Sequence, residues 1–373
     1  MRVALMGRSL RPPLTGIGRY TLNLARALAA ALSPGAVTLF LTRDAVALDG
    51  LPCVRALAPL PTPHELLRGA WEQLLVPLAV RRGQHDIYHS PNFTLPLSLP
   101  CPAVLTVHDL AYLRGGLHNA RLQMYLRLLT SLAIARAARI IAVSQSTRRE
   151  LEARYPRARG RVSVVYPGLD PQFWHPPAAS AIRAFRERLG LSRPYLLFVG
   201  TIEPRKNLPR LVRAFEKAVQ EASLPHELVV CGPWGWRHEA AARALARSPL
   251  RQRIRRLGYL PQEELPLLYA GAELLAYPSL LEGFGFPPLE AMALGTPVLT
   301  SDTSSLPEVV GTAAVTVSPL SVEGIAQGIL RLLHDRSLAD RLRSAGPERA
   351  RQFTWERAAR ETLEAYFQAR RES

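Results

Sequence analysis

Short apolar runs alternate with longer helical patterns along this whole sequence, and this alternation constrains the fold more than any other feature. The runs are rich in Val, Ile and Leu, which is typical of strands buried on both faces of a parallel sheet. The longer stretches repeat apolar residues every three or four positions, as amphipathic helices do. Because parallel strands need crossover connections, the sequence predicts an α/β fold with parallel sheets.

The alternation falls into two consecutive series, and 373 residues exceed the size at which one hydrophobic core is usual. The strands predicted in the first series are 2–6, 37–41, 87–88, 103–107, 140–143 and 162–165. Those in the second are 195–199, 227–230, 254–257, 274–277, 297–300 and 314–317. Helices are predicted at 18–32, 122–137, 208–221 and 322–334. The sequence therefore predicts two Rossmann-like domains, with the boundary in the proline-rich stretch 171–180.

The net charge of +17 is concentrated in the first half of the chain. Residues 1–175 contain 21 arginines and 9 acidic residues, a net charge of +12, and the rest contributes +5. This balance favours anionic partners: a membrane surface, a lipid-linked phosphate or an acidic polymer. Nucleic acid is not expected, since neither an RNP motif nor Cys/His finger spacing occurs. Peripheral contact with an anionic membrane is expected at an apolar helical pattern bordered by arginines: Arg121, Leu122, Tyr125, Leu126, Arg127, Leu129, Arg136 and Arg139.

The amino-terminal residues resemble a buried strand that runs into a glycine turn, without the features of a signal peptide. No apolar run reaches the roughly 18 residues that cross a bilayer. Cys53, Cys101 and Cys231 lie far apart without metal-ligand spacing, which fits a reducing compartment. The expected location is the cytoplasm, with peripheral attachment to the inner face of the cytoplasmic membrane.

The segment 279–295 carries the strongest functional signal. Glu282 and Glu290 flank the Gly-x-Gly turn 283–285, and two prolines then open a short helix. The glycines let the backbone approach a ligand, and the free amides at the helix start favour an anion. The two carboxylates suit the hydroxyls of a sugar and a ribose, so the segment predicts a sugar-nucleotide site. Alternatively, Glu290 only complements the helix dipole and the glycines only serve the turn.

Arg205 and Lys206 follow the first predicted strand of the second series and precede a helix. Arginine offers a planar fork to phosphate oxygens and lysine a compact point charge. The pair therefore predicts a diphosphate site, and the alternative is a solvated basic turn.

Two segments of the first series add weaker candidates. Gly16 and Gly18 form a Gly-x-Gly before a helix, which equally suits a simple turn. His108 and Asp109 directly follow a buried strand, where polar pairs face the ligand side of an α/β sheet. The alternative is a histidine that caps a turn.

Three of these stretches together resemble the retaining glycosyltransferases of family 4. They read Thr-Val-His-Asp-Leu at 106–110, Glu-Pro-Arg-Lys-Asn at 203–207 and Glu-Gly-Phe-Gly-Phe-Pro at 282–287. The resemblance extends from Gly7 to the final helix and is nearest to bacterial mannosyltransferases of O-antigen or exopolysaccharide synthesis. One departure is Thr201, which stands where some members carry an arginine.

The resemblance implies a GT-B fold, in which two Rossmann-like domains face each other across a cleft. Residues 1–172 would form the acceptor domain and 173–354 the donor-nucleotide domain, with helix 355–373 packing back on the first. The implied catalytic residues are His108, Asp109 and Glu282, with no metal ion. The implied diphosphate-binding residues are Gly16, Gly18, Arg205, Lys206, Gly283, Phe284 and Gly285. The implied nucleotide-binding residues are Gly232, Tyr259, Leu260 and Glu290.

The implied activity is the transfer of a hexose, mannose by preference, with retention of anomeric configuration. The donor would be a nucleotide-diphospho-sugar, a GDP-sugar by preference, and no further cofactor is expected. The acceptor would be a glycan or a lipid-linked glycan of a cell-surface polysaccharide. The alternatives are a non-catalytic sugar-nucleotide-binding protein, which would lose the donor-contacting charges, and a GT-B nucleotide-sugar epimerase, whose own motifs are not visible.

Overall fold

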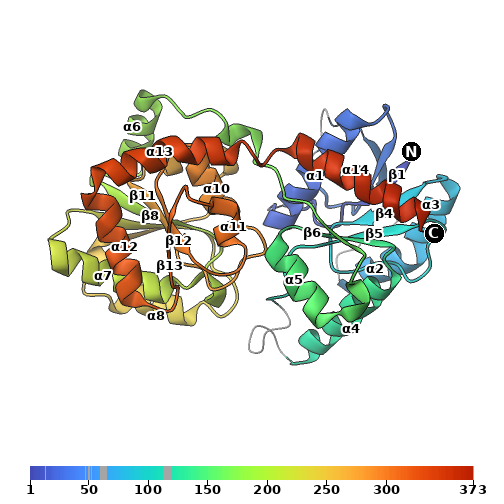
Figure 1. Ribbon diagram of the computed structural model, residues 1–373, viewed down its shortest axis with the longest axis horizontal. Coiled ribbons are helices and arrows are strands. Elements are labelled where there is room, and N and C mark those ends of the chain that lie inside the picture. Colours follow the sequence, from blue (N-terminus) through green and yellow to red (C-terminus); the bar gives the residue numbers. More distant parts are fainter. Residues whose placement is uncertain are drawn as a thin grey trace. The chain divides into compact units, whose positions relative to one another are not determined.

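The computed structural model describes residues 1–12, 14–46, 48, 51, 53–58, 65–111 and 120–372. The chain forms two compact units (Figure 1). Unit 1 comprises Met1–Gly168 and Phe353–Ser373, and unit 2 comprises Leu169–Gln352. The chain thus leaves unit 1 just before the proline-rich stretch 171–180 and returns to it just before the last helix.

Unit 1 contains a parallel sheet of seven strands in the order β3-β2-β1-β4-β5-β6-β7. The strands are β1 (Val3–Met6), β2 (Val37–Leu41), β3 (Val54–Leu57), β4 (Ile87–Ser90), β5 (Ala103–Val107), β6 (Arg139–Ala142) and β7 (Val162–Val164). The strand order reverses direction at β1, because β2 pairs on one side of it and β4 on the other. In open parallel sheets, ligands bind beyond the carboxyl ends of the strands at such a reversal.

Helices cover both faces of this sheet. They are α1 (Gly16–Ala31), α2 (Glu65–Ala70), the π-helix η1 (Trp71–Leu75), α3 (Val76–Arg82), α4 (Ala120–Arg136), α5 (Gln145–Arg154), the 3₁₀ turn η3 (Pro156–Ala158) and α14 (Trp355–Arg371). Trp71, Val80, Ile134 and Leu151 bring η1, α3, α4 and α5 into one hydrophobic core with the strands. The last helix, α14, packs beside α1 and against β5 and β6 (Figure 1).

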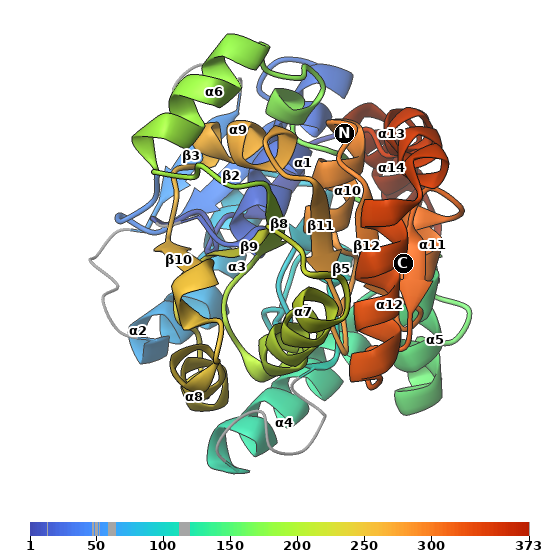
Figure 2. The ribbon, with the colours of Figure 1, turned by 90° about the vertical axis from the view of Figure 1, so that its left-hand side faces the viewer.

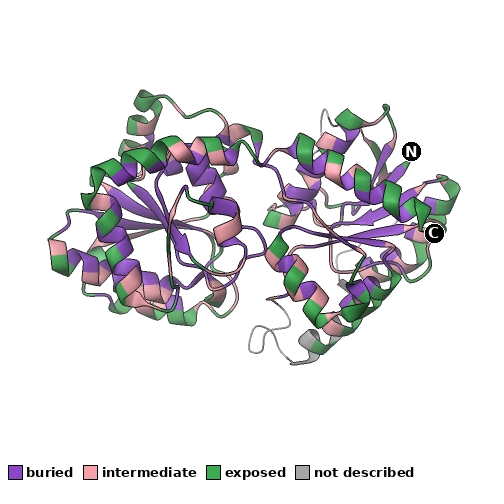
Figure 3. Cartoon of the chain, in the orientation of Figure 1, coloured by how far each residue is buried: buried purple, intermediate pink, exposed green. Residues whose placement is uncertain are grey.

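Unit 2 repeats the same architecture with six parallel strands in the order β10-β9-β8-β11-β12-β13. The strands are β8 (Tyr195–Val199), β9 (Glu227–Cys231), β10 (Ile254–Gly258), β11 (Leu274–Tyr277), β12 (Val298–Ser301) and β13 (Val315–Val317). Here the order reverses at β8, which pairs with β9 and with β11. β8, β9, β11 and β12 are buried along their whole length (Figure 3).

The helices of unit 2 also lie on both faces of its sheet. They are α6 (Ala179–Arg188), α7 (Leu208–Ala222), α8 (Glu239–Arg247), α9 (Leu265–Ala270), α10 (Phe286–Ala293), α11 (Leu306–Val310), α12 (Val322–His334) and α13 (Arg336–Ala350). Short 3₁₀ turns occur at η4 (Pro171–Phe173), η5 (Pro204–Lys206), η6 (Arg251–Arg253) and η7 (Gln262–Glu264). The apolar stripes of α7 and α12 meet side by side in the main core of this unit (Figure 2).

The two doubly wound parallel sheets confirm the predicted α/β fold class. Within the described ranges, no helix combines the length and the apolar character needed to cross a bilayer. Strand β3 is not predicted from the sequence. It lies at the edge of its sheet, where Val54 is half exposed and the apolar run is broken by Arg55.

Candidate active site

The best-defined polar cluster of unit 2 lies at the reversal point of its sheet. β8 and β11 are neighbours there, and the loops that follow them are joined by a hydrogen bond from the Leu280 amide to the Arg205 carbonyl, at 2.7 Å. The predicted diphosphate motif and the predicted sugar-binding carboxylate Glu282 are therefore brought together, although they lie far apart in the sequence.

The loop after β8 places Arg205 and Lys206 in the 3₁₀ turn η5, in front of α7. Asn207 ends this turn in the left-handed conformation with φ +62°. Its side-chain amide donates to the Pro278 carbonyl at 2.9 Å and to the Pro319 carbonyl at 2.7 Å. These bonds hold the two cations at a fixed position before the helix begins.

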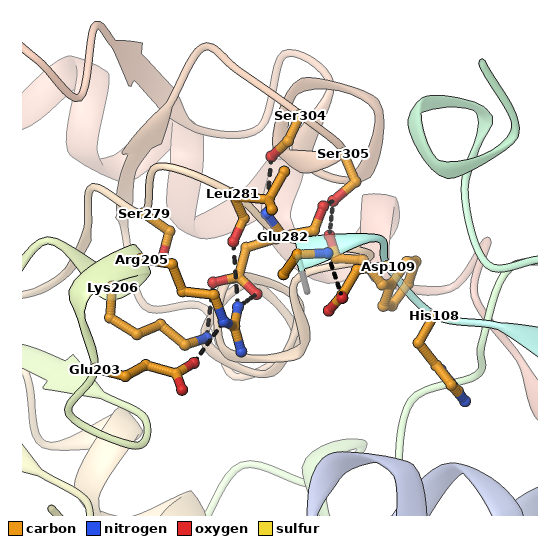
Figure 4. A network of polar contacts seen from close by, with 12 residues as sticks. His108, Asp109, Glu203, Arg205, Lys206, Ser279, Leu281, Glu282, Ser304 and Ser305 are labelled. Carbon is orange, nitrogen blue, oxygen red and sulfur yellow. Dashed lines mark hydrogen bonds and ion pairs between the residues drawn. The ribbon is translucent and has the colours of Figure 1, made fainter. Parts of the chain in front are cut away.

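Arg205 and Lys206 both contact the carboxylate of Glu282 (Figure 4). Arg205 Nη1 lies 2.7 Å from one oxygen and Lys206 Nζ 2.7 Å from the other. Arg205 Nε also lies 2.5 Å from Glu203, and the Tyr277 hydroxyl donates to Glu282 at 2.8 Å. Lys206 is 6% exposed and Glu282 is 7% exposed, so the ion pairs are largely shielded from water.

Burial and the neighbouring cations shift the pKa of Glu282 in opposite directions. Burial alone would raise the pKa of its carboxyl group, but Arg205 and Lys206 hold this pKa at about 2. The pKa of Lys206 is lowered by burial and by Arg205, and Glu282 offsets part of that effect. At neutral pH the Glu282 carboxylate is therefore ionised.

The Gly-x-Gly turn after Glu282 is fixed by two serines. The amide of Glu282 donates to Ser304 Oγ at 3.1 Å, and the Ser305 hydroxyl lies 3.0 Å from the Glu282 carbonyl and 2.7 Å from that of Phe284. Gly285 has φ +116°, and a Cβ atom there would lie 2.8 Å from Leu306. Only glycine suits this position, and α10 begins directly after it, with prolines in its first turn as predicted.

Glu290 lies in the second turn of α10 and is 1% exposed. Its carboxylate accepts a hydrogen bond from the Tyr269 hydroxyl at 2.7 Å. The helix dipole acts mainly within the first turn. Compensation of the dipole is therefore a weak reason for a buried carboxylate in the second turn. Its assignment to the ribose remains a prediction.

The predicted nucleotide-binding loops follow β9 and β10. Gly232 has φ +141°, and a Cβ atom there would lie 2.1 Å from the Gly200 carbonyl oxygen, which makes this close approach of two loops specific to glycine. The Gly232 amide also donates to the Gly258 carbonyl at 2.7 Å. Tyr259 is 59% exposed and Leu260 is partly buried at the same edge of the sheet.

Three residues of this cluster are not among the site residues predicted from the sequence: Glu203, Trp236 and Tyr277. Trp236 Nε1 donates to Glu203 at 2.6 Å, and Glu203 in turn holds Arg205. Tyr277 is fully buried, and Lys206 also donates to its hydroxyl. Glu203 stands within the Glu-Pro-Arg-Lys motif, and Tyr277 begins the Tyr-Pro-Ser stretch 277–279 that also resembles the family, so both could have been proposed. No local pattern marks Trp236.

In unit 1, His108 follows β5 at the carboxyl edge of the sheet. Its Nε2 lies 3.0 Å from the Pro91 carbonyl, which can only accept, so Nε2 carries the proton and Nδ1 of the neutral ring does not. Burial lowers the pKa of His108 to about 4, and the ring is therefore neutral at physiological pH. Asp109 accepts a hydrogen bond from the Ala111 amide at 3.0 Å and closes a turn.

Gly16 and Gly18 lie in the first turn of α1, whose amino terminus is capped by Thr15. A Cβ atom at Gly18 would lie 2.7 Å from the Ser9 carbonyl, whereas one at Gly16 would meet no atom within 4 Å. The structure thus explains Gly18 by close packing in unit 1, and both donor-phosphate assignments remain predictions. In the parts of the chain that the structure describes, no group of three or more His, Cys, Asp or Glu residues could hold a metal ion.

Comparison with known proteins gives the family of both halves of the chain. The model of "Glycosyltransferase Family 4" matches residues 14–173 and that of "Glycosyl transferases group 1" matches residues 182–349. The chain is 32% identical over 388 residues to O-antigen chain mannosyltransferase B of Escherichia coli, covering 98% of this chain and 99% of that protein. It is 28% identical to the serotype-specific mannosyltransferase WbdA of Escherichia coli, covering 74% of this chain and 35% of that protein.

Solved structures share the fold at lower identity. Sucrose-phosphate synthase from Thermosynechococcus elongatus matches with a TM-score of 0.78 and 22% identity, over 99% of this chain and 98% of that one. Anabaena HepE in complex with UDP and glucose matches with a TM-score of 0.76 and 20% identity, over 98% and 99% of the two chains. The two Rossmann-like units have the GT-B fold, and the family matches make the protein a glycosyltransferase. The chain belongs to glycosyltransferase family 4.

Proposed function

We propose that this glycosyltransferase transfers mannose from a GDP-sugar to a glycan or lipid-linked acceptor during synthesis of a cell-surface polysaccharide. The observation that carries the proposal is the cluster of Arg205, Lys206 and Glu282 at the reversal point of the unit 2 sheet. It combines cations for a diphosphate with a carboxylate for sugar hydroxyls. The choice of mannose and of the polysaccharide rests on the similarity to the two Escherichia coli mannosyltransferases.

In the proposed reaction, the acceptor hydroxyl attacks the anomeric carbon on the face from which the diphosphate leaves. The bond from the acceptor oxygen to the anomeric carbon forms, and the bond from that carbon to the phosphate oxygen breaks. The hydroxyl proton passes to the departing phosphate oxygen, and the anomeric configuration is retained. Arg205 and Lys206 stabilise the negative charge that develops on the leaving group, so no metal ion is required.

His108 is assigned to the transferred sugar. Its Nδ1 is unprotonated because Nε2 donates to Pro91, so Nδ1 accepts a hydrogen bond from a sugar hydroxyl. Since the pKa of this ring is about 4, it keeps this form throughout the neutral range. Asp109 contributes by fixing the turn that follows the histidine.

Turnover assays with purified nucleotide sugars test the proposal. The protein is mixed with GDP-mannose, UDP-glucose or ADP-glucose and a lipid-linked glycan acceptor, and the released nucleoside diphosphate and the glycosylated product are measured. Release of GDP with matching product supports the proposal. Binding without release would favour the sugar-nucleotide-binding alternative, and a new epimeric nucleotide sugar without acceptor would favour the epimerase.

Kinetics of single variants test the roles of the two carboxylates. Glu282 should contact the sugar as positive charge develops at the anomeric carbon, whereas Glu290 should hold the ribose equally in ground and transition states. We expect Glu282→Gln and His108→Ala to lower kcat by about 100-fold or more, the scale of a lost transition-state contact. Glu290→Gln should mainly raise the donor KM. A wild-type kcat in Glu282→Gln would overturn this assignment.

A further inference from the structure

The charges of the unit 2 cluster compensate one another internally. Arg205 lies between the carboxylates of Glu203 and Glu282, and Lys206 contacts the second oxygen of Glu282. Two cations therefore face two carboxylates. A diphosphate that enters this cluster meets cations that already have an anionic partner at 2.5–2.7 Å.

The two carboxylates differ in what holds them. Glu203 receives a hydrogen bond from the Trp236 indole at 2.6 Å and packs in the same loop as Arg205. Glu282 instead comes from the loop after β11, which also forms the glycine turn and leads into the short helix α10. Glu282 is thus the carboxylate that reaches across from a second loop to both cations (Figure 4).

We infer that Glu282 is an internal competitor of the donor's diphosphate, and that it makes the site prefer an intact sugar donor over a free nucleoside diphosphate. This inference rests on the proposed function. When phosphate oxygens bind Arg205 and Lys206, the carboxylate loses part of its ion pairing. A shielded carboxylate that loses its partners without replacement raises the free energy of the complex.

An intact donor replaces the lost partners of Glu282, and the released product does not. The hydroxyls of the transferred sugar donate hydrogen bonds to the carboxylate, whereas a nucleoside diphosphate has no group at that place. The Tyr277 hydroxyl holds the carboxylate in both cases. The same residue thus contacts the sugar during transfer and favours release of the diphosphate afterwards.

Affinity for inorganic pyrophosphate tests the competition directly, because this probe has neither sugar nor base. We expect Glu282→Gln to bind pyrophosphate about 10-fold more tightly than wild type by calorimetry, the scale of one charge-assisted contact. Glu323→Gln is the matched control: it removes an exposed carboxylate of the same unit that pairs with Lys217 at 2.8 Å, and its affinity should be unchanged. Equal or weaker binding of pyrophosphate by Glu282→Gln would overturn the inference.

A second variant, Glu282→Asp, tests the inference even if Glu282→Gln does not fold. Glu282→Asp keeps the charge on a shorter side chain, and it should bind pyrophosphate with an affinity between those of wild type and Glu282→Gln. If Glu282→Gln fails to fold, an unchanged or weakened affinity in Glu282→Asp overturns the inference.

The preference for donor over product gives the second measurement. In wild type, GDP-mannose should bind more tightly than GDP, and Glu282→Gln should shift this ratio toward GDP by about 10-fold. An unchanged ratio in a variant that folds and binds both ligands overturns the inference while the proposed function stands. Gain of pyrophosphate affinity without any binding of nucleotide sugars would instead reject the proposed function.

Discussion

Arg205 and Lys206 are two neighbouring cations with different surroundings. The Arg205 side chain is 23% exposed and reaches Glu203 and Glu282, whereas Lys206 is buried beneath the loop and contacts Glu282 and Tyr277. The partly exposed guanidinium can donate two parallel hydrogen bonds to phosphate oxygens, whereas the buried ammonium acts as a point charge. We therefore expect the two residues to contribute separately to anion binding.

Replacement of either cation should weaken binding of the preferred nucleoside diphosphate. We expect Arg205→Ala and Lys206→Ala each to cost about 1.5–3 kcal/mol of binding free energy, the usual range for a hydrogen bond to a charged group. Lys217→Ala is the control, since it removes the only other lysine of the chain from an exposed ion pair with Glu323. Calorimetry measures the three variants, and unchanged affinity in both loop variants would place the phosphate site elsewhere.

At this scale, the sequence predicts which residues carry charge but not how they pair. Arg205, Lys206 and Glu282 stand in recognisable motifs, so each can be proposed as a ligand-binding residue. Their ion pairs join positions more than 70 residues apart, and no local pattern encodes such contacts. Trp236, a partly buried residue in the loop after β9, is missed for the same reason, because its partner Glu203 lies 33 residues away in the sequence.

The elements themselves are mostly predicted by periodicity, because buried parallel strands have a clear apolar signal. β1, β5, β8 and β11 lie where the apolar runs place them, within one residue. The edge strand β3 gives no such signal. The position of Arg205 and Lys206 in a 3₁₀ turn depends on the left-handed Asn207, a conformation that the sequence does not specify.

Helix α14 is tied to the β4–β5 region of unit 1 by buried hydrogen bonds. The Tyr366 hydroxyl lies 2.6 Å from His89 Nδ1, and His89 Nε2 lies 2.7 Å from the Thr106 hydroxyl. All three side chains are fully buried. Thr106 is also two residues before His108, so the last helix supports the strand that presents the predicted catalytic histidine.

Removal of the Tyr366 hydroxyl should leave a ring nitrogen of His89 unsatisfied in the core. We expect Tyr366→Phe to lower the free energy of unfolding by about 1–3 kcal/mol, the cost of such a group. Tyr88→Phe is the matched control: its hydroxyl is buried without a hydrogen-bond partner in the described part of the chain, so its loss should not destabilise. Urea unfolding compares the two, and equal stability of both variants would contradict the role of this network.

Helix α4 exposes an apolar row in unit 1. Met124, Leu128 and Leu132 are 66%, 58% and 40% exposed at intervals of four residues, and Arg136 continues the row. The Arg136 guanidinium donates to the carbonyl of Leu97, which is itself 60% exposed. The side chains of Arg121, Leu122, Tyr125 and Leu126 lie outside the described residues.

This row is the place where we expect the proposed contact with an anionic membrane. Leucines can enter the interface while nearby arginines gain about 1 kcal/mol each from anionic lipids. At low salt the protein should float with vesicles containing phosphatidylglycerol, and the double variant Met124→Gln, Leu128→Gln should float less. Phe367→Gln on α14 is an exposed apolar control. Equal flotation with neutral vesicles would reject the electrostatic attachment.

The molecule as a whole buries histidines that stay neutral in the folded state. Burial lowers the pKa of His89 to about 3 and that of His108 to about 4, and it also lowers those of His85 and His226. Unfolding returns these groups to their ordinary pKa near 6.5, so the unfolded chain binds more protons below that pH. Stability therefore falls as the pH drops from about 6.5 toward 4. The stability supplied by Glu282 is lost only in more acidic solution, between its ordinary pKa and about 2.

His89→Gln should make the stability less dependent on pH, because the variant takes up one proton fewer when it unfolds. Glutamine can keep polar contacts in the core but does not titrate. Between pH 5 and 6 we expect the free energy of unfolding of unit 1 to change less steeply by about 1.4 kcal/mol per pH unit. Hydrogen exchange followed by mass spectrometry reads this free energy for each unit separately. His175→Asn, at an exposed position of unit 2, should leave the slope of unit 1 unchanged. A slope in His89→Gln equal to that of wild type would mean that His89 does not become protonated on unfolding in this range.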